Sequence, residues 1–272
     1  MALNGPSETD EVRQALEAGH VGLLTCAEQA KLRQTSLLIA GCGVGSVVAV
    51  SAARMGFERF RLADGDAVET RNLNRQAFSL ADVGKPKAEA LSAILLGINP
   101  QCEVDAIPRF VDVANAAELV AGMDIVVDSI DPTSAVAVLA LHRAARAQSK
   151  FVVSPLDLGW GGALQVFAPS GPPLEQLLGV EVGADLTLAD DAVLFGAFAT
   201  AVQGMVPQYL MPAVKSTMDG SLAHFPQPVS GAMVAASMTI VAVMRIALGL
   251  PVKDGVSVAQ FDPWLVHEEV GE

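Results

Sequence analysis

The sequence predicts an α/β protein with a doubly wound, mostly parallel β-sheet. Between residues 36 and 168, short apolar segments alternate with helix-like segments, and strands joined by helical crossovers form parallel sheets. The stretch GCGVGS (residues 41–46) follows the first apolar segment and opens a helix-like one, which is typical of nucleotide-binding folds. Apolar residues make up 51% of the 272-residue chain and charged residues 17%, so the composition favours a large core over disorder.

The elements follow one another in the order that this fold requires. Residues 8–35 read as one amphipathic helical segment. The apolar SLLIA predicts a first strand at 36–40, VVAVSAARMGF a helix ending near Gly56, and RFRLAD a second strand that acidic residues close. A further helix has Pro86 in its first turn and ends at the Asn-Pro pair at 99–100.

The second half of the sheet continues this alternation. A third strand is predicted at 102–107 and a fourth at 124–130, with a short helix at 114–120 between them. The last parallel strand is expected to be followed by an antiparallel one, which extends the sheet. These remaining elements are, in order, a helix at 135–149, a strand at 151–155 and an antiparallel strand at 162–169.

The chain divides into three parts. Residues 1–35 are expected to form an N-terminal helical segment, and residues 36–168 a Rossmann-like domain. Residues 169–272 form a C-terminal lobe of helices and loops, continuous with the same domain, for substrate binding and dimerisation. Within it, residues 231–250 predict a long apolar helix interrupted by Arg245. We interpret it as a core or dimer-interface helix, and not as a membrane span.

Charge and cysteine usage exclude some classes of function. The formal net charge is −13 and the pI is about 4.7, so the surface repels phosphate backbones, and no run of Lys or Arg offsets this. We therefore expect no nucleic-acid partner. Cys26, Cys42 and Cys102 form no C-x-x-C pair, which predicts neither a zinc site nor a disulfide framework and fits a reducing cytoplasm. The N-terminus does not resemble a signal peptide.

The glycine turn and an acid about twenty residues later indicate a nucleotide. Gly41, Gly43 and Gly45 allow the backbone to approach a phosphate, and the following helix N-terminus offers unpaired N–H groups. Their spacing is one residue shorter than the dinucleotide motif G-x-G-x-x-G. Asp64 closes the second strand, where a carboxylate can accept both hydroxyls of a ribose. Together the two features indicate a nucleotide without identifying it.

The stretch LADGDAVETRNLNRQ (residues 62–76) favours a triphosphate. Arg contacts phosphate oxygens in pairs and Lys acts as a point charge, so such a cluster can neutralise a leaving pyrophosphate. A nicotinamide-dependent oxidoreductase, the alternative on this fold, shares the glycine turn and the ribose-binding acid but has no use for the cluster. The residues concerned are Asn72, Arg75, Gln76, Lys85 and Lys87.

A second group of carboxylates follows the fourth strand. DSID (residues 128–131) lies at the carboxyl edge of the predicted sheet, where open α/β sheets bind their ligands. One carboxylate together with phosphate oxygens commonly holds Mg²⁺. The sequence therefore predicts that a metal–nucleotide complex binds at this edge.

The segments IAGCGVGS, LADGDAVETRNLNRQ, DVGKPKAEA, INP and DIVVDSID, in this order and spacing, resemble the ThiF/MoeB/HesA family, the bacterial relatives of ubiquitin-activating enzymes. In that family a C-terminal carboxylate attacks the α-phosphate of ATP and gives an acyl-adenylate and pyrophosphate. The resemblance implies an ATP- and magnesium-dependent adenylyltransferase that acts as a homodimer. Its substrate would be the C-terminus of a peptide or carrier protein, or a small acid.

The resemblance also implies the roles of individual residues. Asp64 would hold the ribose and Asp131 the magnesium ion, while Asp66 and Gln76 would order the loop. The implied catalytic residues are Arg75, Lys87 and Asp131. The residues implied to bind or surround the nucleotide are Gly41, Gly43, Gly45, Asp64, Asp66, Asn72, Gln76 and Lys85.

The chain departs from the family pattern in three places. Ala40 and Cys42 stand where the family usually has glycines. In relatives, an N-terminal arginine motif of one protomer reaches the site of the other, and this chain lacks that motif. The alternative therefore stays open that the chain is a non-catalytic partner subunit of a heterodimeric activating enzyme. Residues 151–272 contain no cysteine, so neither a thioester nor a zinc knuckle can form there. An adenylate would therefore pass to an external nucleophile or to an atom of the substrate itself.

Overall fold

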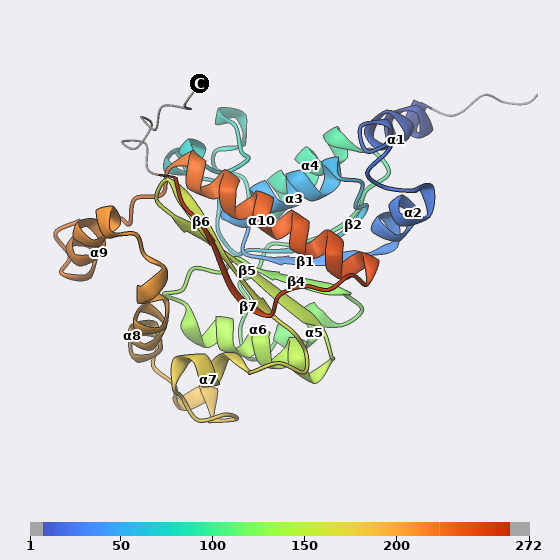
Figure 1. Ribbon diagram of the computed structural model, residues 1–272. Helices are drawn as coiled ribbons and strands as arrows, with labels where there is room; N and C mark the ends of the chain where they lie inside the picture. The colour runs from blue at the N-terminus through green and yellow to red at the C-terminus, as the bar shows by residue number, and fades with distance from the viewer. Residues whose placement is uncertain (1–7, 223, 262–272) are drawn as a thin grey trace, which may run out of the picture.

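The computed structural model describes residues 8–222 and 224–261, and its centre is a seven-stranded sheet in the order β3-β2-β1-β4-β5-β6-β7 (Figure 1). Strands β1 to β5 are parallel, β6 pairs antiparallel with β5, and β7 pairs antiparallel with β6. The doubly wound, mostly parallel fold with an antiparallel extension is confirmed. The strands are β1 (Ser36–Ala40), β2 (Arg59–Ala63), β3 (Glu103–Ile107), β4 (Ile125–Asp128), β5 (Phe151–Leu158), β6 (Gly161–Phe167) and β7 (Gly255–Ala259).

Helices cover both faces of the sheet, which is why the central strands are apolar at consecutive positions. In β1, Leu37 and Ile39 belong to one hydrophobic core, and Leu38 and Ala40 belong to the other. The first core lies under α3 (Val44–Arg54), α4 (Lys87–Ile98) and α10 (Val229–Leu248), and the second under α5 (Ala116–Val120) and α6 (Ala135–Ala147) (Figure 1).

The segment predicted to be helical, residues 8–35, is divided in two. The structure has two helices, α1 (Glu8–Ala18) and α2 (Cys26–Gln34). Gly22 between them has φ +91°, a conformation that favours glycine and that no helix contains. Thr25 then caps α2, since its side chain accepts the N–H of Glu28 and its own backbone N–H donates to the Glu28 carboxylate.

Two strand predictions also need correction. Strand β5 continues to Leu158, past the predicted end at residue 155. Strand β7 is absent from the sequence-based prediction, and it adds to β6 with Val256 opposite Gln165. Both differences have the same cause, because the extension of β5 and the addition of β7 depend on pairing with β6, which the local pattern does not specify.

The long apolar helix α10 packs along the sheet. Its length and composition are sufficient for a membrane span, but it contacts β5, β6 and α3. Ala235, Ala236 and Val243 on its inner side are almost completely buried, whereas Met233 and Val241 are about half exposed. This packing agrees with the interpretation of the segment as a core helix with one apolar face turned outward.

Of the predicted C-terminal lobe, residues 169–222 lie beside the sheet, whereas α10 packs on the sheet and β7 belongs to it (Figure 1). Tyr209 connects residues 169–222 to the turn between β5 and β6: its hydroxyl accepts the backbone N–H of Trp160 at 2.8 Å and donates to the carbonyl of Leu158 at 3.3 Å. The lobe contains α7 (Leu174–Leu178), α8 (Asp191–Val202) and α9 (Met211–Met218), with short 3-10 helices at Leu186–Leu188, Gln203–Met205 and Gln208–Leu210.

Candidate active site

The predicted site residues gather at the carboxyl ends of β1, β2 and β4. The strand order reverses between β1 and β4, and such a reversal opens a crevice at this edge of the sheet. Gly41 enters the glycine turn with φ +85°, and a Cβ there would overlap the carbonyl of Ser129. A Cβ at Gly45 would overlap the Ser129 hydroxyl and come within 2.8 Å of Ile39. These two glycines therefore let the turn pack closely against the segment after β4.

Gly43 has different surroundings. It is the N-terminal cap of α3, and a Cβ there would meet nothing closer than the Gln76 amide nitrogen at 3.6 Å. Its φ of −72° is one that any residue adopts, but its ψ of −103° lies outside the α and β regions. Gly43 is thus the member of the turn whose small size no packing contact explains, and it lies where a helix N-terminus presents N–H groups to an anion.

Asp64 ties β2 to the glycine turn. Its Oδ2 accepts the backbone N–H of Cys42 at 2.6 Å, and its Oδ1 accepts the backbone N–H of Asp66 at 2.8 Å. The carboxylate is buried. Burial raises the pKa of Asp64, and the positive charge of Lys87 opposes this shift. The predicted ribose-binding acid, Asp64, therefore bonds to the turn and interacts with the charge of Lys87.

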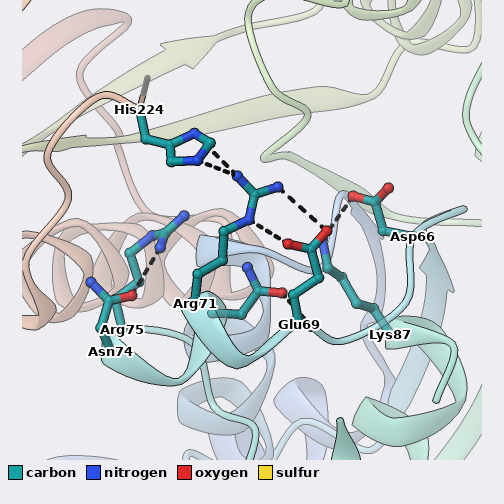
Figure 2. A network of polar contacts seen from close by, with 8 residues as sticks. Asp66, Glu69, Arg71, Asn74, Arg75, Lys87 and His224 are labelled. Carbon is teal, nitrogen blue, oxygen red and sulfur yellow. Dashed lines mark hydrogen bonds and ion pairs between the residues drawn. The ribbon is translucent and has the colours of Figure 1, made fainter. Parts of the chain in front are cut away.

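A backbone ladder brings Lys87 to this position. Val68 donates to the carbonyl of Lys85 at 2.8 Å, and Lys87 donates to that of Asp66 at 2.9 Å. The Lys87 ammonium then contacts the Asp66 carboxylate at 2.8 Å and is largely buried (Figure 2). Lys85 instead points to the exposed side and pairs with Asp82 at 3.0 Å, in the short 3-10 helix Leu80–Asp82. The two lysines of this segment thus lie in different surroundings.

The NLNRQ segment (residues 72–76) contains the end of the 3-10 helix Thr70–Asn74 and the residues just after it. Asn72 is buried and its side-chain oxygen accepts the backbone N–H of Glu69 at 2.9 Å. Arg71 pairs with Glu69, and its guanidinium lies 3.1 and 3.2 Å from the two ring nitrogens of His224 (Figure 2). Asn74 donates to the carbonyl of Gln227 at 3.0 Å. The loop before α10 therefore lies against this segment.

Arg75 is the half-buried cation of the site. One guanidinium nitrogen donates to Asn74 at 2.9 Å, but its Nε is buried without a hydrogen-bond partner (Figure 2). Burial lowers the pKa of Arg75, and the carboxylates of Asp157 and Asp131 oppose that shift. Gln76 beside it is also buried, and its side-chain oxygen has no partner. Buried polar atoms without partners are rare in folded proteins, and each calls for an explanation such as a water, an ion or a functional role.

Asp131 is exposed at the end of the segment after β4. Its Oδ1 accepts both the backbone N–H and the hydroxyl of Thr133, at 3.0 and 2.7 Å, which fixes the carboxylate at the sheet edge. Within residues 8–222 and 224–261, no three His, Cys, Asp or Glu side chains gather as a metal site. A lone carboxylate fits Mg²⁺ that takes its other ligands from phosphate and water, and it does not fit a zinc site.

Sequence reasoning missed two residues of this region. Ser129 binds the glycine turn, because its hydroxyl donates to the carbonyl of Gly41 at 2.6 Å. Asp157 in β5 is buried, and neither of its carboxylate oxygens has a hydrogen-bond partner. An acid inside an otherwise apolar strand segment, SPLDLG, is the signal in the sequence that could have drawn attention to it.

The cysteines lie in unreactive or remote places. Burial, and then the nearby Asp64 carboxylate, raises the pKa of the Cys42 thiol well above its usual value. Burial likewise raises the pKa of Cys102 to about 12. Since the thiolate is the nucleophile, neither residue suits covalent catalysis at neutral pH. Cys26 begins α2 and is exposed, away from the carboxyl edge of the sheet.

Two relatives match part of the chain. The chain is 37% identical over 105 residues to the SAMP-activating enzyme E1 of Haloferax volcanii, covering 38% of this chain and 39% of that protein. It is 36% identical over 122 residues to the tRNA threonylcarbamoyladenosine dehydratase of Bacillus subtilis, covering 44% and 46%. The chain thus matches less than half the length of these relatives.

Solved structures share the whole fold. PaaA superposes with a TM-score of 0.67 at 17% identity, covering 97% of this chain and 83% of PaaA. The tRNA N6-threonylcarbamoyladenosine dehydratase TcdA of E. coli gives 0.62 at 21%, covering 87% and 95%. MccB of E. coli, solved with ATP, gives 0.62 at 21%, covering 89% and 65%. The profile of the ThiF family matches residues 13–264, and the chain therefore belongs to the ThiF family.

Proposed function

We propose that this protein is an ATP- and magnesium-dependent adenylyltransferase that activates a carboxylate as an acyl-adenylate. The observation that carries the proposal is that Asp64 and Lys87 adjoin the glycine turn, while Arg75 lies in the field of Asp131, which follows β4. Asp64 holds the turn, Lys87 lies in its electrostatic field, and Arg75 has a buried donor without a partner. The names of several relatives support the same activity: MOCS3 of Mus musculus is an adenylyltransferase and sulfurtransferase, and MccB was solved with ATP.

The proposed roles follow the positions of the residues. The ribose of ATP would lie at Asp64 and its phosphates over Gly43 and the N-terminus of α3. Arg75 and Lys87 would neutralise the β- and γ-phosphates. Asn72 and Gln76 would shape the loop that carries Arg75, since the side-chain oxygen of Asn72 already orders that loop. Lys85, which pairs with Asp82 on the exposed side, would contribute little.

The chemistry would be mainly electrostatic. A carboxylate oxygen of the substrate attacks the α-phosphorus, the bond from that phosphorus to the bridging oxygen breaks, and pyrophosphate leaves with the electron pair. Arg75 and Lys87 stabilise the charge that develops on the leaving group. Asp131 would hold Mg²⁺, which supplies further charge neutralisation at the phosphates when bound. No general base is needed, because a carboxylate is already ionised at neutral pH.

The adenylate would leave without a covalent enzyme intermediate. The described cysteines are buried or remote from the site, and residues 151–272 contain none. The acyl group would therefore pass to an external nucleophile or to an atom of the same substrate. The carboxylate would be a peptide or carrier-protein C-terminus, or a small acid; the structures of MccB with MccA support a peptide. A net charge of −13 argues against a tRNA substrate.

We also propose that the protein is a homodimer in the cytoplasm. The outer face of α10 supports the dimer, because Val229, Met233 and Val241 remain exposed on a helix whose inner side is buried. Next to it, a groove of about 310 Å³ lies between α3, α4 and the first turn of α10, and Arg75 and Gln76 line one end. A second copy placed on this face would border the site.

The first test is the binding of ATP by calorimetry, with and without Mg²⁺, on the wild-type protein and Asp131→Ala. Magnesium-dependent binding that weakens at least tenfold in the variant is expected. Carboxylate-dependent ATP–pyrophosphate exchange should then fall by orders of magnitude in Arg75→Ala and Asp131→Ala while both stay folded. Exchange that survives in both variants would disprove the roles. Binding of NADH in place of ATP would indicate an oxidoreductase, and binding of neither would indicate a non-catalytic partner subunit.

A further inference from the structure

Asp157 is a buried acid that the proposed adenylation roles leave unused. It lies one residue before the end of β5, is only 6% exposed, and neither oxygen accepts a hydrogen bond. Strand β6 places Gly162 opposite it. The first turn of α10 packs against it so closely that a Cβ at Gly231 would overlap Oδ1. A carboxylate in such surroundings is costly when charged, because no hydrogen-bond donor of the surrounding protein stabilises the charge.

One cation acts on this carboxyl group. Burial raises the pKa of Asp157 to about 7, and Arg75 is the charged group that opposes the rise. At its two closest neighbours in β6 and α10 no ionisable side chain is present, since β6 presents Gly162 and α10 presents Gly231. The same Arg75 is attracted by Asp131 at the end of β4. The guanidinium therefore lies in the field of two acids, one exposed and one buried.

The arrangement has a consequence if Arg75 binds the phosphates of ATP, and this step rests on the proposed function. A polyphosphate attracts the guanidinium more strongly than a single carboxylate does, because Arg binds phosphate oxygens in pairs. The positive charge is then shared with several negative ones. Asp157 would be left as a buried carboxylate with no compensating cation, and such a group binds a proton.

We propose that Asp157 is the counter-charge that positions Arg75 in the ATP-free site, and that it takes up a proton when ATP binds. In the ATP complex Asp157 is then a neutral carboxylic acid. A neutral acid does not repel the carboxylate that must approach the α-phosphate, and its O–H is a hydrogen-bond donor. The uptake of a proton by Asp157 therefore removes one negative charge from a strongly acidic protein, and so prepares the site for an anionic second substrate after ATP.

The test is isothermal titration of Mg–ATP at pH 7.5 in two buffers of different ionisation enthalpy, PIPES and Tris. The dependence of the measured heat on the buffer gives the number of protons taken up. Wild type is compared with Asp157→Asn, which keeps the shape of the side chain, and with Asp157→Ala as a second variant. The control is Asp105→Asn, which removes an exposed acid on β3 that pairs with Arg61. Protonation of ATP itself is common to all four proteins and cancels in the comparison.

We expect wild type and the control to take up about half to one proton per ATP more than the two Asp157 variants, by linkage. At pH 8.5 the variants should bind ATP up to about tenfold more tightly than wild type, and the difference should shrink as the pH falls to 6.5. Equal proton uptake in wild type and the variants, with ATP bound, would overturn this inference and leave the proposed function intact. If wild type binds no ATP, the proposed function and this inference fail together.

Discussion

The carboxylate of Asp64 accepts a 2.6 Å hydrogen bond from the backbone N–H of Cys42, so the acid that closes β2 directly holds the glycine turn that follows β1. The turn is held from the other side by Ser129, whose hydroxyl donates to the carbonyl of Gly41. Three strands thus determine the position of one short turn. This rigidity explains how the turn keeps its place with an alanine and a cysteine where the family usually has glycines.

The glycines of the turn are expected to respond differently to the same substitution. Gly45→Ala should destabilise the protein by about 1–3 kcal/mol, because its new methyl group overlaps the Ser129 hydroxyl. Gly43→Ala should destabilise the protein less than Gly45→Ala but weaken ATP binding, since its methyl group meets no protein atom closer than 3.6 Å. Thermal unfolding and ATP titration of the two variants measure this. A large loss of stability in Gly43→Ala would show that this glycine, too, serves packing.

The two lysines of GKPK provide a matched pair. Lys87→Met should lower ATP–pyrophosphate exchange by about a hundredfold or more, because it removes a largely buried charge beside the glycine turn. Lys85→Met removes an exposed partner of Asp82 and should change the exchange rate less than threefold. Steady-state exchange assays at saturating ATP compare them. Equal losses in both variants would place Lys85 at the phosphates as well.

Asp157 should make the stability of the fold depend on pH. Its pKa is raised to about 7 in the folded protein, so between roughly pH 4 and pH 7 the unfolded chain has lost the proton and the folded chain keeps it. Stability conferred by the protonated form is therefore lost as the pH rises through this window. The advantage of Asp157→Asn over wild type should grow by about 2 kcal/mol from pH 5.5 to pH 8.5. Urea unfolding at both pH values measures it, and a constant difference would contradict the assigned shift.

The exposed face of α10 is the expected dimer contact. Met233→Glu and Val241→Glu place charges on side chains that are about half exposed in the single chain, so they should convert a dimer to monomers without unfolding it. Val193→Glu, on the exposed side of α8, is the control and should remain dimeric. Light scattering after gel filtration gives the mass of each. An unchanged mass in all three proteins would reject this interface.

The sequence could indicate which residues lie near one another because they fall in a few short segments with a specific spacing. Asp64 and Lys87 both contact Asp66, and Asn72 orders the following loop. The spacing could not separate Lys85 from Lys87, since their surroundings depend on the ladder between residues 66–68 and 84–87. The spacing also could not show which of the three glycines pack closely against other atoms and which have open space, because that difference depends on Ser129 in a distant segment.

The sequence by itself determined the order of the predicted strands and helices, the switch to an antiparallel strand, and the residues at the carboxyl edge of the sheet that indicate a nucleotide. These features follow from local periodicity and from motifs within single segments. The tertiary structure alone decided the break between α1 and α2, the addition of β7, and the burial of Asp157 without a hydrogen-bond partner. These features depend on which distant segments pack together. A residue such as Asp157 becomes informative only after folding, because burial is what makes its charge costly.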